Sequence, residues 1–229
     1  KSKGNVIDPL KIINVYGADP LRLTLSSMAA QGRDIKLSED DVKINRNFIT
    51  KLWNAYKFLD KNKCISNEDN KLTKIENEIN LWAISKSNEF IIDVGKEIEN
   101  FRFNDASKSI IRFTKNIYCD WYLEFLKILL GKINNKRELK ETKDCANYIF
   151  NVILKISHPI IPFVTDEIYF NLIKNSKFLI SEVWPKAKKI SSAKKSLKNI
   201  DQIISFITKI RNTRSSLKVE AKAFTNIYF

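Results

Sequence analysis

The sequence predicts a mainly α protein, in which a short N-terminal segment is followed by an antiparallel helical bundle. Nearly every segment of the 229 residues repeats apolar side chains at helical spacing. Only 5 Gly and 5 Pro are present, too few for the many tight turns of a β-sandwich or barrel. The hydrophobic fraction of 44% excludes a disordered tail. Long helical segments with short polar links are typical of a helical bundle.

Two short helices are expected at the start of the chain. An Asp-Pro pair opens each of them, at residues 8–9 and 19–20, because aspartate caps a helix N-terminus and proline suits the first turn. Gly17 is a typical C-terminal stop for the first helix, and the second runs over residues 21–30. Residues 33–37 alternate polar and apolar side chains, which fits either a short strand or an extended connector.

A long helix is predicted after Ser38, which with Asp41 three residues later resembles a capping box. This helix ends before a polar loop at residues 61–77. The side chains expected to face inward from it are Val42, Ile49, Leu52, Tyr56 and Leu59, flanked by Phe48 and Trp53. The other bundle helices are expected over residues 78–100, 104–130, 139–157 and 165–175, with a charged loop at 132–140.

The last part of the chain differs from the bundle. The lysines between residues 186 and 198 are interspersed with serines, and predict a solvated basic linker rather than a specific site. Isoleucines at helical spacing then predict a helix from Ile200 that includes Leu217. Residues 223–229 suit a strand that has no partner after it, which suggests that the natural chain continues.

The charge balance favours a polyanionic partner. Forty Lys+Arg against 26 Asp+Glu give a formal charge of +14, and each phosphate that a protein neutralises releases condensed counterions. Because Lys, Asn and Ile are used heavily throughout, compositional drift alone could also add surface lysines. No uncharged apolar run approaches the roughly 20 residues of a membrane span, and no signal peptide opens the chain.

Several kinds of chemistry are disfavoured. A single histidine, His158, precedes a proline and is expected to end a helix as a packed or capping residue, which argues against Ser-His and Cys-His nucleophile pairs. Three cysteines at wide spacings predict neither a disulfide framework nor a zinc site, and fit a reducing cytosol. Asp120 and Glu124 share a helical face without a third ligand nearby. We expect an ion pair or hydrogen bond from them to Arg102, Arg112 or another bundle arginine.

One helical stripe carries side chains that suit unstacked bases. Asn47, Lys51, Asn54 and Phe58 follow one another along it, with Lys57 adjacent to the ring. Amides and lysine hydrogen-bond base edges, and an aromatic ring stacks on a base. The alternative is an ordinary polar face with Phe58 packed into the bundle.

Two other segments offer contacts to phosphate. Arg211 and Arg214 border the apolar stripe of the last helix, where they would either contact nucleic-acid phosphates or bridge bundle carboxylates such as Asp120; we favour the structural role. The basic loop at residues 1–9 could hold phosphate through lysine charge and backbone N–H groups, although such loops are usually just solvated.

The opening residues resemble the end of the Lys-Met-Ser-Lys-Ser signature of class I aminoacyl-tRNA synthetases, with Lys1 and Ser2 as its last two residues. The blocks that continue this resemblance are residues 5–9 (Asn-Val-Ile-Asp-Pro), 16–19, 21–22, 119–124, 158–163, 166–168 and 210–214. Residues 31–38, 46–48 and 51–55 are similar to the valyl branch in particular. Isoleucyl and leucyl relatives generally lack the Gly-Arg-Asp and Lys-Leu-Trp-Asn-Ala segments found here.

The resemblance implies that the chain is divided into three parts. Residues 1–37 would be a stem-contact segment with the end of the signature loop, and residues 38–185 a helical-bundle anticodon-binding domain. Residues 186–229 would be a basic linker, a long helix and the start of a truncated C-terminal subdomain. With this resemblance, the stripe through Lys51 is interpreted as the surface that reads the anticodon.

The resemblance also implies the chemistry of an intact enzyme that ligates valine to tRNA(Val) with ATP, accompanied by Mg. Lys1 would bind the triphosphate and stabilise charge on the departing pyrophosphate, and Ser2 is a further candidate ATP contact. ATP and valine would bind to a catalytic domain that precedes Lys1, so we expect the chain alone to be inactive, with no metal or cofactor of its own.

The expected state is a cytoplasmic monomer that binds tRNA, but no DNA and no membrane. The alternatives are the same region of an isoleucyl-type synthetase, and a free-standing helical RNA-binding or protein-interaction module.

Overall fold

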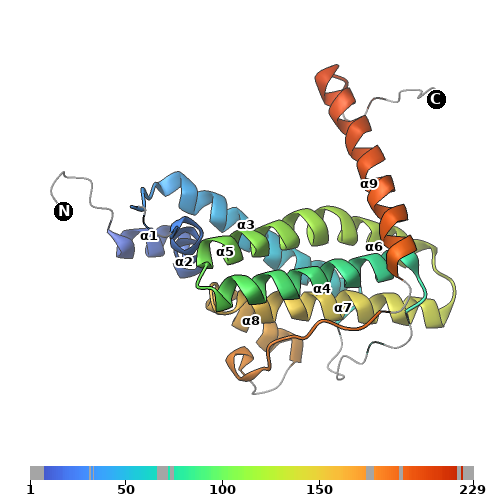
Figure 1. The fold of residues 1–229 in the computed structure, drawn as a ribbon, viewed down its shortest axis with the longest axis horizontal. Helices are drawn as coiled ribbons and strands as arrows, with labels where there is room; N and C mark the ends of the chain where they lie inside the picture. The colour runs from blue at the N-terminus through green and yellow to red at the C-terminus, as the bar shows by residue number, and fades with distance from the viewer. Residues whose placement is uncertain are drawn as a thin grey trace.

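The computed structural model confirms a mainly α fold for the part of the chain that it describes (Figure 1). The described residues are 8–30, 32, 34–65, 72, 75–173, 178–190, 193–220 and 223. All regular elements within these ranges are helical, and none of these helices is long and apolar enough to cross a membrane. Lys1, Ser2 and all but the first residue of the predicted strand at 223–229 lie outside them.

Two short helices, α1 (Pro9–Tyr16) and α2 (Ala18–Met28), begin the described chain. The amide of Leu10 donates to the Asp8 carboxylate at 3.0 Å, which confirms the predicted cap. Gly17 joins the helices with a φ of +94°, a conformation that L side chains rarely adopt. Leu23 of α2 is fully buried in the main hydrophobic core, so α2 packs as part of the bundle.

The bundle helices lie along the long axis of the molecule, and α9 projects from them at the end opposite α1 and α2 (Figure 1). The N-terminal part of α9 packs against the bundle, where Ile200 is buried in the main core. Ser38 and Asp41 form the predicted capping box at the start of α3. Between α8 and α9 the chain runs back along the bundle, where Asn88 and Lys188 exchange two hydrogen bonds of 2.8 and 2.9 Å. The elements are α3 (Glu39–Lys61), α4 (Glu78–Glu99), α5 (Phe103–Arg112), η1 (Phe113–Tyr122), α6 (Leu123–Lys132), α7 (Lys136–Ser157), α8 (Pro162–Ile173), η2 (Leu179–Ser181) and α9 (Ala193–Ser216).

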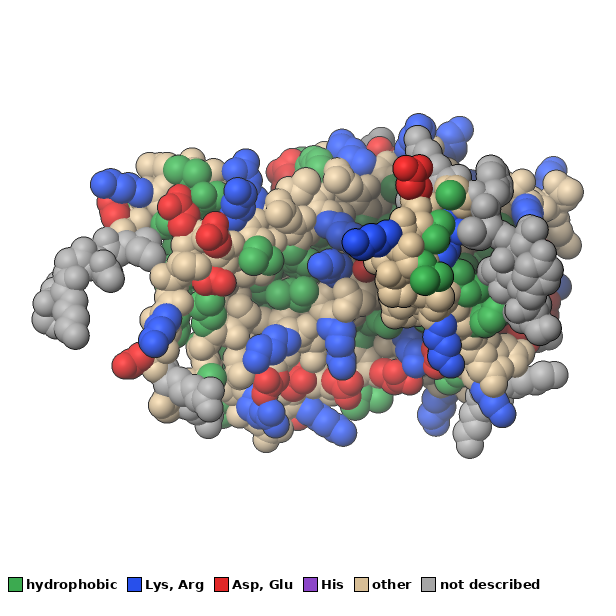
Figure 2. Space-filling model, turned by 90° about the horizontal axis from the view of Figure 1, so that it is seen from above, with side chains coloured by type: hydrophobic (Ala, Val, Ile, Leu, Met, Phe, Trp, Pro, Cys, Tyr) green, Lys and Arg blue, Asp and Glu red, His purple; other side chains and the backbone are tan. Residues whose placement is uncertain are grey.

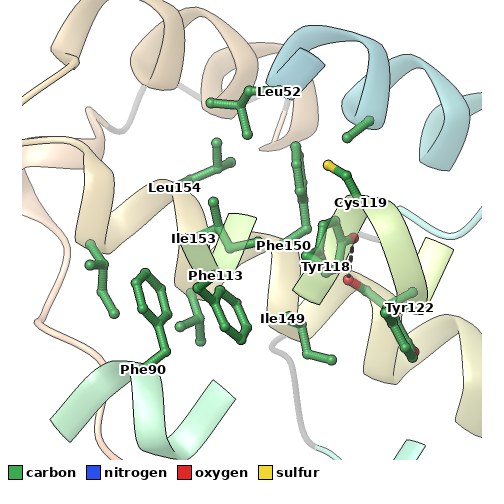
Figure 3. Packing of buried hydrophobic residues seen from close by; sticks show 14 of the residues in the cluster. Leu52, Phe90, Phe113, Tyr118, Cys119, Tyr122, Ile149, Phe150, Ile153 and Leu154 are labelled. Carbon is green, nitrogen blue, oxygen red and sulfur yellow. Dashed lines mark hydrogen bonds between the residues drawn. The ribbon is translucent and has the colours of Figure 1, made fainter. Parts of the chain in front are cut away.

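The core lies where α3, α4, η1 and α7 meet (Figure 3). Phe90 of α4 and Phe113 of η1 stack with their ring centroids 4.3 Å apart. Tyr118 and Phe150 are also buried, with their ring centroids 6.0 Å apart and their ring planes inclined by 23°. Aromatic pairs of this kind stabilise a core beyond the area that they bury, and these two connect η1 to α4 and to α7.

Three predictions about the helices differ from the structure. The expected helix over residues 104–130 contains a π-helical stretch, η1, in its middle. The charged loop expected at 132–140 is shorter, because Asn135 accepts a hydrogen bond from the Arg137 amide at 2.9 Å and so caps α7. Helix α9 begins at Ala193, inside the lysine run that predicted a linker. Residues 34–38 form no regular structure, which favours the extended connector over the strand.

Helix α8 begins at Pro162, three residues before the predicted cap Thr165, because α2 caps it from a distance. The amides of Phe163 and Val164 donate to the buried Asp19 carboxylate at 3.3 and 2.6 Å. Arg22, one turn along α2, donates to the carbonyl oxygens of the turn before α8, Pro159 at 3.0 Å and Ile160 at 2.9 Å. These four bonds hold α2 on the corner between α7 and α8.

Candidate nucleic-acid interface

The predicted stripe lies on α3 where this helix faces η1 and α6. We call Asn47, Lys51, Asn54, Lys57 and Phe58 the α3 face. The two asparagines and Lys57 are exposed, whereas Lys51 and Phe58 are half-buried. Asp120 of η1 and Lys127 of α6 contact these two half-buried members. Side chains of three helical elements therefore meet at the α3 face.

Lys51 is held by a carboxylate from η1. Its Nζ lies 2.5 Å from Oδ1 of Asp120, and the two side chains are 36% and 44% exposed. The prediction that Asp120 forms an ion pair is confirmed, but the predicted arginine partner is wrong. The lysine comes from α3, 69 residues away in the sequence.

Phe58 is partly buried and partly exposed, so its position agrees in part with each of the two interpretations drawn from the sequence. One part of its ring packs against the hydrophobic core, as the packed alternative expected. The ammonium of Lys127 on α6 lies 5.8 Å from the ring centroid, and Glu124 holds that ammonium at 2.6 Å. A cation over an aromatic face is attracted by the ring quadrupole. Sequence reasoning missed Lys127, although its spacing of three residues from Glu124 on a helix predicts such a pair.

Lys57 lies next to two aromatic rings. Its Nζ lies 5.2 Å from the ring centroids of both Trp53 and Tyr56, which themselves meet edge to face at 5.4 Å. The ring quadrupoles attract the ammonium and so orient the Lys57 side chain. Lys57 and Lys51 therefore differ in their electrostatic surroundings, although both belong to the α3 face.

The two arginines of α9 make structural contacts. The guanidinium of Arg211 lies 5.2 Å over the ring of Trp121, the residue after Asp120 in η1. Arg214 donates to the carbonyl oxygens of Glu220 and Ala223, each at 2.8 Å. The structural role is thus supported, but through an aromatic ring and backbone groups rather than through Asp120.

A groove of about 670 Å³ borders the α3 face toward α1 and α8. The rings of Tyr16, Trp53 and Phe163 line it together with Arg46 and Glu167. Figure 2 shows one face of the molecule on which lysine and arginine side chains are spread widely, with acidic side chains among them. The positive charge of that face is therefore distributed rather than gathered in one patch.

The described residues contain no cluster of three or more His, Cys, Asp or Glu side chains that could hold a metal ion. All three cysteines are buried free thiols. Burial raises the pKa of Cys64 to about 11 and that of Cys119 to about 12, and it also raises the pKa of Cys145. Burial lowers the pKa of His158, whose Nδ1 lies 2.9 Å from Oγ1 of Thr165. These groups are packing elements, as expected for the histidine.

Two family models match the chain. Residues 80–228 match the model described as anticodon-binding domain of tRNA ligase, and residues 1–38 match that of tRNA synthetases class I (I, L, M and V). The chain therefore belongs to the anticodon-binding domain family of the class I tRNA ligases. The α3 face lies between the two matched ranges.

Within this family the chain is similar to valine–tRNA ligases over nearly its whole length, α3 included. It is 41% identical to the enzyme of Zymomonas mobilis over 221 residues, which cover 96% of this chain and 25% of the relative. The enzyme of Pelagibacter ubique is 39% identical over 230 residues, 99% of this chain and 26% of the relative. The chain thus matches the C-terminal part of valyl-tRNA synthetases and spans about a quarter of the length of these curated relatives.

A solved structure has the same fold. It is the ternary complex of Agrobacterium radiobacter K84 agnB2 LeuRS with tRNA and LeuAMS, with a TM-score of 0.63 at 18% sequence identity. The similarity covers 99% of this chain and 29% of that chain. At this identity the likeness concerns the helical architecture.

Proposed function

We propose that this chain is the tRNA-binding part of a valine–tRNA ligase and that its α3 face reads the anticodon of tRNA(Val). The observation that carries the proposal is the α3 face itself, with two exposed amides, a lysine held in place by a carboxylate and a half-buried aromatic ring. Membership of the anticodon-binding family and the similarity to valine–tRNA ligases support it. The net charge of +14 suits a polyanionic ligand.

Each member of the α3 face has a distinct chemical task in this proposal. Phe58 stacks on an unpaired base of the anticodon loop, since its ring is anchored in the bundle on one side. Asn47 and Asn54 exchange hydrogen bonds with base edges, because an amide both donates and accepts. Lys57, which has no carboxylate partner among the described residues, attracts the phosphate backbone.

In the whole enzyme, valine would be ligated to tRNA(Val) at the expense of ATP. Lys1 and Ser2 are proposed as the ATP contacts of the signature loop, with Lys1 stabilising charge on the departing pyrophosphate. ATP would bind together with Mg, and we assign no cofactor to the described residues. We propose a cytoplasmic monomer as the working form.

The test compares two replacements of one ring in binding titrations with anticodon stem-loop RNA. Phe58→Ala removes both the core packing and the stacking surface, whereas Phe58→Leu keeps much of the apolar volume and removes only the aromatic face. Both variants should lose about 1–3 kcal/mol, or roughly 5- to 150-fold, with the valine anticodon. They should lose far less with an RNA whose anticodon bases are replaced.

Phe101→Ala is the matched control, because Phe101 is 71% exposed in the turn between α4 and α5, away from the α3 face. This variant should bind both RNAs as the parent does. If Phe58→Leu lowers only the melting temperature and keeps the anticodon preference, the ring is a packing element and the assignment is wrong.

A further inference from the structure

Two carboxylates four residues apart each hold a lysine beside the α3 face. Asp120 holds Lys51 at 2.5 Å, and Glu124 holds Lys127 at 2.6 Å while that ammonium lies over Phe58. Like charges at this helical spacing repel each other, and the two lysines compensate them. Acidic groups at a surface that binds a polyanion oppose binding, so their position here calls for a functional reason.

The reason follows from how a neighbouring carboxylate limits the contacts that a lysine ammonium can make. A free ammonium is a point charge on a flexible stem and is drawn to any phosphate within reach. With Asp120 at hydrogen-bond distance, one N–H of Lys51 is used and the remaining donors are restricted in direction. The carboxylate also repels an approaching phosphate, whereas the neutral edge of a base meets no such repulsion.

The element that carries Asp120 differs from its neighbours. It is the π-helical segment η1, a rare conformation that is found frequently at functional sites. Its consecutive residues Asp120 and Trp121 contact different helices, since Asp120 holds Lys51 of α3 and Trp121 lies under Arg211 of α9. The contact with Arg211 joins η1 to α9.

We propose that Asp120 is a positioning residue that directs Lys51 to a base edge of the anticodon and keeps it from binding phosphate. The carboxylate lowers the affinity for RNA in general and raises the discrimination between anticodons. This inference rests on the proposed function and assigns Lys51 to base recognition, in contrast to Lys57, which has ring faces in place of a carboxylate.

The experiment measures binding of fluorescent anticodon stem-loops, one with the valine anticodon and one with its anticodon replaced, across a series of salt concentrations. Asp120→Asn should bind both RNAs more tightly than the parent, and the ratio between them should fall several-fold. The salt slope should steepen by about 0.7 to 0.9, the value for one additional phosphate contact. Lys51→Ala should also reduce the ratio but leave the slope nearly unchanged.

Glu89→Gln is the matched control, because it removes the same charge from an ion pair on α4 whose lysine, Lys86, keeps a second carboxylate in Asp201. This variant should leave the ratio between the RNAs unchanged. An exposed ion pair contributes little to stability, so melting curves should show every variant folded.

The outcomes separate the inference from the function on which it rests. If the parent chain binds the two RNAs equally, the proposed anticodon reading fails and the inference fails with it. If the parent discriminates but Asp120→Asn keeps the full ratio, the inference alone is overturned. A lower salt slope in Lys51→Ala at an unchanged ratio would likewise overturn it, because Lys51 would then be a phosphate contact.

Discussion

Replacing Asp19 with alanine should destabilise the chain more than removing any exposed helix cap. Asp19 is only 4% exposed, and its carboxylate accepts the amides of Phe163 and Val164 at the start of α8. Burial raises the pKa of Asp19, because lost hydration outweighs the two amide bonds and the nearby Arg22. The cost of Asp19→Ala therefore comes from two unpaired N–H donors rather than from the loss of a favourable charge.

A fully buried donor left without an acceptor costs about 1–3 kcal/mol, and because these two amides are only part-buried we expect the lower end of that range, about 2 kcal/mol for the pair. For a chain of this size, 1 kcal/mol lowers Tm by about 2–4 °C, so Tm should fall by about 4–8 °C. Thermal unfolding followed by circular dichroism measures this shift, and urea unfolding checks the free energy independently.

Asp8→Ala is the control, because Asp8 caps the helix that directly follows it in the sequence. Asp8 is exposed and accepts the Leu10 amide at 3.0 Å, so its removal should cost about 1 kcal/mol. If Asp19→Ala lowers the stability no more than Asp8→Ala does, capping across 144 residues contributes nothing beyond local capping, and the reasoning is refuted.

Three further outcomes are expected. Burial raises the pKa of Glu97, whose Oε2 is buried without a hydrogen bond, so the folded state disfavours the charged form and loses stability as the pH rises through that pKa. Glu97→Gln should raise Tm at pH 7, and this advantage should vanish toward pH 4. Binding of tRNA should weaken with salt, the logarithm of the affinity falling by about 0.7 to 0.9 per log unit for each phosphate contact; a flat titration would favour a protein ligand. Iodoacetamide at pH 7.5 should leave the buried cysteines unmodified in the folded chain and label all three in urea, as mass spectrometry would show.

The sequence alone determined the fold class and most of the helices. The Asp8 cap and the capping box of Ser38 and Asp41 are bonds between residues two or three positions apart, so neighbouring residues encode them. The apolar period of α3 likewise predicted most of the inward side chains, and Leu52 and Leu59 are fully buried. Ile49, which was predicted to face inward, is only partly buried, whereas Phe48, predicted to flank the inward side chains, is buried. The side chains of the α3 face were predicted as a group for the same reason.

The contacts of those side chains follow from the packing of the helices. The pairing of Lys51 with Asp120 joins residues 69 apart, and the cap that Asp19 supplies to α8 spans 144 residues. No local pattern encodes such contacts, because they depend on how the helices pack and on the register at which each face meets its neighbour. The π-helical stretch η1 contributes to that register, because it places Asp120 against α3 and Trp121 against α9. Helix formation is a property of neighbouring residues, whereas the choice of an ion-pair partner is a property of the packed bundle.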